Sequence, residues 1–225
     1  MKKTALASLL TLLVMSPLVR AQAPFEGTAT WSLSIPQMDD EKHEMTINMK
    51  ADKVETDLDL GAQGGIKTYL DRANKKVYIV MSAMKSGMVM DMPNDSVIKS
   101  KTEDIEVKST GQKETVAGHI AEEYQIHAKS GEISMWMSAD FPQNVRDAFH
   151  RAMGAQHQDP AASHAMEQLA AKGLVPVKMV VKNGGEIAAA MELVKLEPKK
   201  LDDSVFETPK DIKFSPMPTG MHGMN

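Results

Sequence analysis

Residues 25–35, "FEGTATWSLSI", decide the fold, because apolar and polar side chains alternate along them. The apolar set is Phe25, Ala29, Trp31, Leu33 and Ile35, and the polar set is Glu26, Thr28, Thr30, Ser32 and Ser34. A period of two places one set on each face of a β-strand. The stretch therefore predicts a half-buried antiparallel strand.

The same alternation recurs along most of the chain, and turn-forming residues such as those of "RANKK" and "KNGG" separate the apolar runs. The expected strands are 25–35, 43–50, 54–60, 66–71, 76–84, 86–92, 104–110, 113–118, 119–128, 131–138, 174–183 and 186–197. Consecutive short strands with tight turns are typical of an antiparallel meander.

Residues 142–172 follow a different period and predict two short helices. Val145, Phe149 and Met153 have helical spacing, and Pro160 suits the first turn of a second helix that ends before Gly173. We therefore expect one α+β domain over residues 22–214, in which a helical insertion packs on one face of a long antiparallel sheet.

The N-terminal stretch "MKKTALASLLTLLVMSPLVRAQA" is typical of a secretory signal peptide, with two lysines, a short apolar run and small residues at its end. Cleavage fits after Ala21 and, less well, after Ala23, so residues 1–21 are predicted to be removed. We expect a periplasmic protein, or a secreted one. A lipid anchor and disulfides are not expected, because the chain has no cysteine.

Composition argues against two further classes of protein. Without Lys2, Lys3 and Arg20, 23 basic residues face 30 acidic ones, a net charge of −7, which disfavours nucleic-acid binding. The sequence has no G-x-S-x-G, H-E-x-x-H or P-loop motif and no thiol nucleophile, and its carboxylates are predicted to be spread along solvent faces. We therefore expect a protein that is not an enzyme.

Several segments carry a resemblance to a known family: "GQKETVAGHIAEEYQI", "GEISMWMS", "LVPVKMVVKNGG" and "LDDSVFETP". Together they resemble an uncharacterised family of exported bacterial proteins that is grouped by fold with the lipoprotein carrier LolA and the receptor LolB. The resemblance implies a strongly curved, unclosed half-barrel of antiparallel strands with helices on its concave side.

Methionine is unusually frequent, at 19 residues, and "SGMVMDMPND" places three of them at every second position. On a strand they would share one face with other thioethers. The candidate set is Met45, Met49, Met88, Met90, Met92, Met135 and Met137. Three interpretations stay open: core filling, the lining of an adaptable apolar pocket, and ligation of Cu(I).

The C-terminal stretch "SPMPTGMHGMN", residues 215–225, is predicted to be a flexible tail because it has no apolar period. Its sulfur and imidazole donors, Met217, Met221, His222 and Met224, could bind Cu(I) or Ag(I). The alternative is a solvated terminus in a methionine-rich chain.

These features favour a non-enzymatic periplasmic binding or accessory protein. Its expected partner is an apolar small molecule or lipid, or a segment of an envelope protein, held on a methionine-lined concave face. One alternative is a periplasmic Cu(I)- or Ag(I)-binding protein, and another is a structural or interaction module of the cell envelope.

Overall fold

The computed structural model describes residues 23–38, 41–92, 106–128, 131–153 and 160–217. Its strands are β1 (Glu26–Ser34), β2 (Lys42–Lys50), β3 (Lys53–Asp59), β4 (Gly65–Asp71), β5 (Lys76–Met81), β6 (Ser86–Asp91), β7 (Val107–Val116), β8 (His119–Ala128), β9 (Gly131–Ser138), β10 (Val175–Asn183), β11 (Glu186–Pro198) and β12 (Phe214–Pro216). Two α-helices, α2 (Gln143–Met153) and α3 (Pro160–Ala171), and two 3₁₀ turns, η1 (Gly61–Gln63) and η2 (Asp203–Phe206), complete it. None of these helices is long and apolar enough to cross a membrane.

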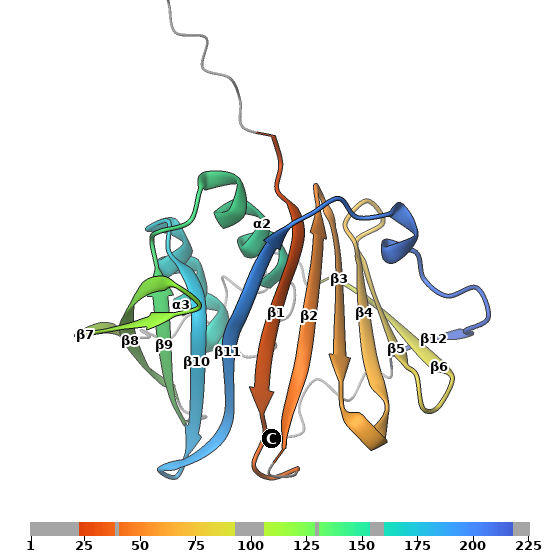
Figure 1. Cartoon of the computed structure of the whole chain (residues 1–225). Coiled ribbons are helices and arrows are strands. Elements are labelled where there is room, and N and C mark those ends of the chain that lie inside the picture. The colour runs from red at the N-terminus through yellow and green to blue at the C-terminus, as the bar shows by residue number, and fades with distance from the viewer. Residues whose placement is uncertain (1–22, 39–40, 93–105, 129–130, 154–159, 218–225) are drawn as a thin grey trace, which may run out of the picture.

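All strands belong to one 12-stranded sheet, in the order β12-β6-β5-β4-β3-β2-β1-β11-β10-β9-β8-β7 (Figure 1). Two antiparallel meanders, β1 to β6 and β7 to β11, meet where β1 pairs with β11. The helices interrupt the second meander between β9 and β10. The predicted α+β class and antiparallel sheet are confirmed.

The sheet is open, because its edge strands β12 and β7 are not neighbours. It is not strongly curled, however, and the predicted strong curvature of a half-barrel is not confirmed. Helices of about 10 Å diameter lie on one face, where α2 contacts β2 and β10 and α3 contacts β8. We call this helix-covered face the inner face and the opposite one the outer face.

The core lies between α2 and the centre of the sheet. Phe149 of α2 is fully buried and packs edge-on against Trp31 of β1, with ring centroids 6.3 Å apart. A register shift between Thr30 and Trp31 makes Val194 of β11 an extra residue that is 57% exposed. This bulge returns the next residue, Leu193, to the inner face opposite Trp31.

Two strands differ from the sequence expectation. The single strand β7 replaces the two strands predicted at 104–110 and 113–118, with an irregular register between Ser109 and Lys113. There the Ser109 hydroxyl accepts a hydrogen bond from the Gly111 backbone, so the chain bulges instead of ending a strand. The short strand β12 was not predicted, because its three residues "FSP" have no alternating pattern long enough to detect.

The segment from residue 199 to 217, here called the C-terminal strap, crosses the outer face from the end of β11 to β6 (Figure 1). The Leu201 backbone donates to Glu26 Oε1 at 2.7 Å, and Lys50 Nζ donates to the Leu201 carbonyl at 2.8 Å. At the far end, β12 pairs with β6 in parallel, and the Phe214 ring packs edge-on against Tyr78 at 5.2 Å. The strap therefore covers part of the outer face of β3 to β6.

Candidate functional site

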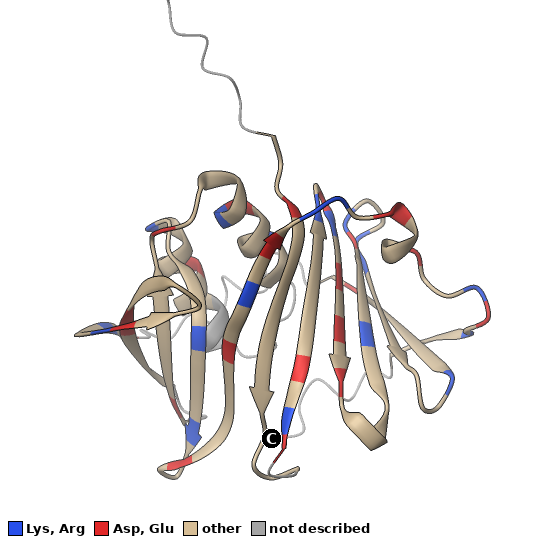
Figure 2. Cartoon of the chain, viewed as in Figure 1, with Lys and Arg blue, Asp and Glu red and all other residues tan. Residues whose placement is uncertain are grey.

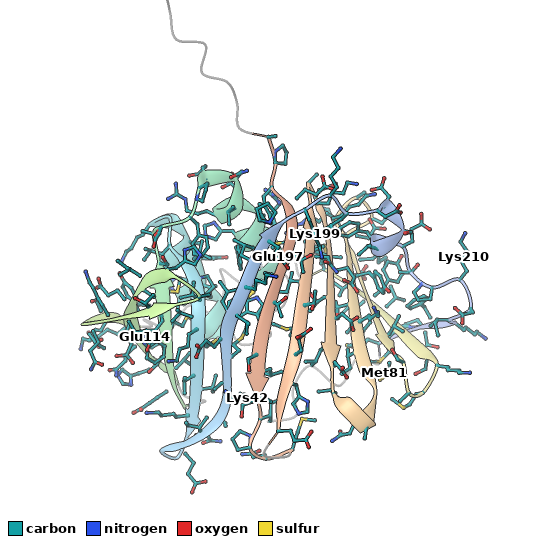
Figure 3. All side chains as sticks on the ribbon, viewed as in Figure 1. Lys42, Met81, Glu114, Glu197, Lys199 and Lys210 are labelled. Carbon is teal, nitrogen blue, oxygen red and sulfur yellow. The ribbon has the colours of Figure 1, made fainter. Side chains whose placement is uncertain are left out.

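The inner face of β2 to β6 is organised in three rows of side chains that run across the strands. Row 1 is Met49, Val54, Leu70, Val77 and Met90. Row 2 is Ile47, Thr56, Thr68, Ile79 and Met88. Row 3 is Met45, Leu58, Ile66, Met81 and Ser86, with Met81 labelled in Figure 3.

Helix α2 lies at the row 1 end of these strands. Its first turn is tied to the chain before β1, because Asn144 Nδ2 donates to the Ala23 carbonyl at 3.0 Å. Its last turn is tied to the β4–β5 turn, because Arg72 Nη2 donates to the Arg151 carbonyl at 2.5 Å. A cation at a helix C-terminus also favours the helix dipole. Both ends of α2 are thus held next to row 1.

On β4 and β5, the residues of row 1 are more buried than those of rows 2 and 3, in line with the position of α2. In row 1, Met49, Val54, Leu70 and Val77 are all at most 9% exposed. In rows 2 and 3 the residues on β4 and β5 are only partly buried: Ile66, Thr68, Ile79 and Met81. With Leu58 and Met88, which are also partly buried, these four form what we call the open half of the inner face.

The chemistry of the open half is apolar and uncharged. None of the inward-facing positions of β3 to β6 carries a charged side chain, and its polar side chains are hydroxyl groups such as that of Thr68. Charged residues recur instead on the outward-facing positions, and Figure 2 shows charged residues along β3 and β4. An apolar surface with few polar groups is the usual lining of a small-molecule site.

The seven methionines predicted to line a ligand site all lie on the inner face, but in different surroundings. Met45, Met49, Met135 and Met137 are at most 9% exposed and belong to the core. Met90 and Met92 are partly buried and pack against it. Only Met88 belongs to the open half, so the residues that complete it are mainly branched aliphatics of β3 to β5. Their signal in the sequence was the alternation itself, which does not show which apolar positions stay uncovered.

Of the four residues predicted to form a metal site in the tail, the structure describes only Met217. Its backbone N–H donates to the Val89 carbonyl at 3.0 Å, which continues the pairing of β12 with β6. Residues 215–217 of the predicted flexible tail therefore belong to the sheet edge. Met221, His222 and Met224 lie outside the described residues. Within the described ranges, no group of three or more His, Cys, Asp or Glu side chains could hold a metal ion.

A polar network on the outer face was missed by the sequence reasoning. Thr28 Oγ1 donates to Asn48 Oδ1 at 2.7 Å, and Asn48 Nδ2 donates to Glu55 Oε2 at 2.7 Å. Lys67 Nζ lies 3.5 Å from Glu55 and 2.6 Å from Asp57. The prediction that the carboxylates line solvent faces is wrong for Glu55, which is 2% exposed. It lies on the face that the strap crosses, and η2 of the strap contacts β3.

Burial raises the pKa of the Glu55 carboxyl above its ordinary value, although the Asn48 hydrogen bond and the Lys67 ammonium act in the opposite direction. The hydrogen bond from Asn48 to Glu55 links the neighbouring strands β2 and β3. We assign this network a structural role, because Glu55 is buried and its partners belong to the neighbouring strands β2 and β4.

Comparison with known proteins supports the fold and leaves the activity open. The model of a family described as DUF4412, a domain of unknown function, matches residues 25–212. No curated protein matches this chain.

Among solved structures, an uncharacterised conserved protein from Thermus thermophilus aligns with a TM-score of 0.56 at 10% identity, over 86% of this chain and 91% of that one. A LolA superfamily protein from Nitrosomonas europaea aligns with a TM-score of 0.34 at 8% identity, over 84% and 92% of the two chains. The MucA/MucB complex of Pseudomonas aeruginosa gives a TM-score of 0.46 at 11% identity, over 83% and 56%. These likenesses concern the fold alone.

Proposed function

We propose that this chain, which belongs to the DUF4412 family, is an exported, non-enzymatic binding protein that holds an apolar, lipid-like ligand on the open half of its inner face. The observation that carries the proposal is that, on β4 and β5, the uncharged side chains of rows 2 and 3 are less buried than those of row 1. The resemblance to the LolA and LolB fold group agrees with a binding or carrier role. Export is proposed from the N-terminal signal, and the absence of a catalytic motif supports a role other than catalysis.

The energetics favour an apolar occupant. Each Å² of apolar surface removed from water contributes about 25 cal/mol, so covering the side chains of the open half stabilises a complex substantially. Contiguous apolar patches on soluble proteins often mark binding sites. A charged ligand would lose its hydration on this face and find no opposite charge, which is costly.

The same surface favours an acyl chain over a segment of a partner protein. A peptide brings a backbone N–H and C=O at each residue, and buried backbone groups need hydrogen-bond partners. The central strands already use their own backbone groups in the sheet, and the inward side chains of β3 to β6 offer few hydroxyl groups. An acyl chain needs no such partners, and Met88 with its flexible thioether can repack around it.

Binding of the apolar fluorescent probe N-phenyl-1-naphthylamine tests the proposal. Ile79→Glu places a charge in the middle of row 2, and we expect it to weaken probe binding by at least about tenfold, because the buried carboxylate would lack a partner. Val194→Glu is the matched control, since Val194 is an exposed apolar side chain of the β11 bulge. We expect this variant to bind the probe like the wild type.

Native mass spectrometry of wild-type protein released from the periplasm should show a bound lipid mass. If folded Ile79→Glu protein bound the probe as tightly as the wild type, and no lipid mass were found, the open half would not be a ligand site. The chain would then be better described as a structural or interaction module of the envelope.

A further inference from the structure

We infer that Met88, Met90 and Met217 form a thioether site for a soft monovalent cation, Cu(I) or Ag(I), at the edge of the inner face where β12 pairs with β6. This site shares Met88 with the open half but goes beyond the proposed lipid-like function, because it needs the sulfur atoms and not merely apolar volume. It also differs from the predicted tail site, since it consists of described residues of the sheet.

The first step is the register of β12 on β6. Phe214 lies opposite Gly87 and Ser215 opposite Met88, in a parallel arrangement. The Phe214 ring lies on the outer face, because it packs on Tyr78 and its carbon atoms would lie 2.6 Å from a Cβ on Gly87. Side chains alternate between faces along a strand. Ser215 and Met217 therefore lie on the inner face, together with Met88 and Met90.

The second step is the spacing. The Met217 backbone N–H bonds the Val89 carbonyl at 3.0 Å, so Met217 is a lateral neighbour of the Met88–Met90 stretch. Adjacent strands lie about 4.8 Å apart, and residues i and i+2 on one face lie about 6.6 Å apart. Methionine is unbranched with three rotatable bonds. Three such side chains on a triangle of this size can turn their sulfur atoms toward one point.

The third step is the environment of that point. Met88, Met90 and Met217 are all partly buried, so the edge is accessible to an ion from solvent. The flanking inward residues of β5, Val77 and Ile79, are apolar and uncharged. Hard cations such as Ca²⁺ and Mg²⁺ require oxygen ligands. Neutral thioethers select Cu(I) among biological metals, and Ag(I) is its soft analogue.

The strap is what assembles this site. Met217 is far from Met88 in the sequence and reaches it only because the strap crosses the outer face and ends as β12. The arrangement depends on Gly87, where a Cβ would lie 2.6 Å from the Phe214 ring and 2.8 Å from Ile212 Cγ2. Binding of the ion should in turn hold β12 in place.

Anaerobic competition between the protein and a chromophoric Cu(I) chelator tests the inference on the full mature chain. Met90→Leu and Met217→Leu keep volume and apolarity but remove one sulfur each. We expect each to weaken Cu(I) binding by about tenfold or more, while N-phenyl-1-naphthylamine binding stays unchanged. Met84→Leu is the control, because it removes an exposed thioether, 65% accessible, from the turn between β5 and β6.

Two more variants separate the edge site from the tail. Gly87→Ala keeps all thioethers but pushes β12 away, and it should weaken Cu(I) binding as Met217→Leu does. A chain that ends after Met217 should retain wild-type affinity, and X-ray absorption of its Cu(I) complex should show sulfur neighbours. Unchanged affinity in the Met90→Leu, Met217→Leu double variant would overturn the inference. A loss on truncation that is absent in Met217→Leu would likewise overturn it and assign binding to residues 218–225.

Discussion

The two faces of strands β3 to β6 have opposite chemistry and are covered by different segments. The outer face carries Lys67, Glu55 and Asp57, and the C-terminal strap crosses it; Glu55 there is only 2% exposed. The inner face carries no charge, yet Ile66, Ile79 and Met88 stay partly accessible. A fold that only minimised apolar exposure would cover the inner face first. The positions of α2 and the strap thus determine which parts of the two faces are covered. The partly accessible open half of the inner face is therefore the part of the sheet to test for function.

The largest expected effect is a loss of stability when the contact of α2 with the inner face is weakened. Phe149→Ala should destabilise the protein by about 3–5 kcal/mol, because it leaves a cavity beside Trp31 and Phe141. Urea unfolding followed by tryptophan fluorescence measures it. Met84→Ala, at an exposed position, should change stability little. Equal stability of the two variants would show that α2 does not close the core.

The next effect is a loss of stability when the packing of the C-terminal strap on the outer face is disturbed. Gly87→Ala should cost about 1–3 kcal/mol through overpacking against Phe214 and Ile212, or should release the strap. Limited proteolysis should then cut within residues 199–217. Gly65→Ala is the matched control, since its nearest contact, the Leu58 carbonyl oxygen, lies at an ordinary 3.4 Å. A strap that resists proteolysis in Gly87→Ala, at wild-type stability, would contradict this account.

A smaller effect concerns the buried carboxylate under the strap. The pKa of Glu55 is raised in the folded protein. Its contribution to the free energy of unfolding is therefore fully present below the ordinary glutamate pKa of about 4.3, and it is lost as pH rises through the folded pKa. Glu55→Gln keeps an acceptor for Asn48 and removes the charge, while Lys67 keeps Asp57 at 2.6 Å.

The Glu55→Gln variant should therefore gain stability relative to the wild type as pH rises from the ordinary glutamate pKa through the folded pKa of Glu55. Thermal unfolding of both proteins from pH 4 to pH 8 measures the difference in their stability. A difference between the two proteins that stayed constant with pH would show that Glu55 does not titrate within the fold.

The smallest effect is expected on the open half. Met88→Leu should change stability by no more than about 0.5 kcal/mol, because Met88 is partly exposed and leucine is similar in volume. A large loss of stability would show that row 2 is part of the closed core, and the contrast between the two faces would then be smaller.

Much of the fold could be predicted because its signals are local. The alternation around Trp31 and the helical spacing of Val145, Phe149 and Met153 gave elements close to β1 and α2. The resemblance to an uncharacterised family was confirmed by the match over residues 25–212. The candidate site could be predicted only in part: the shared face of the methionines follows from alternation, but the division into core and open half does not.

The sequence by itself determined most of the strands, both helices and the face on which most side chains lie, because period and turn residues act within a few residues of each other. Only the tertiary structure decided the pairing of β1 with β11, the burial of Glu55 and the position of Met217 beside β6. Each of these depends on contacts between segments far apart in the chain. No local pattern records such contacts, because their free energy arises only when the helices and the strap pack against the finished sheet.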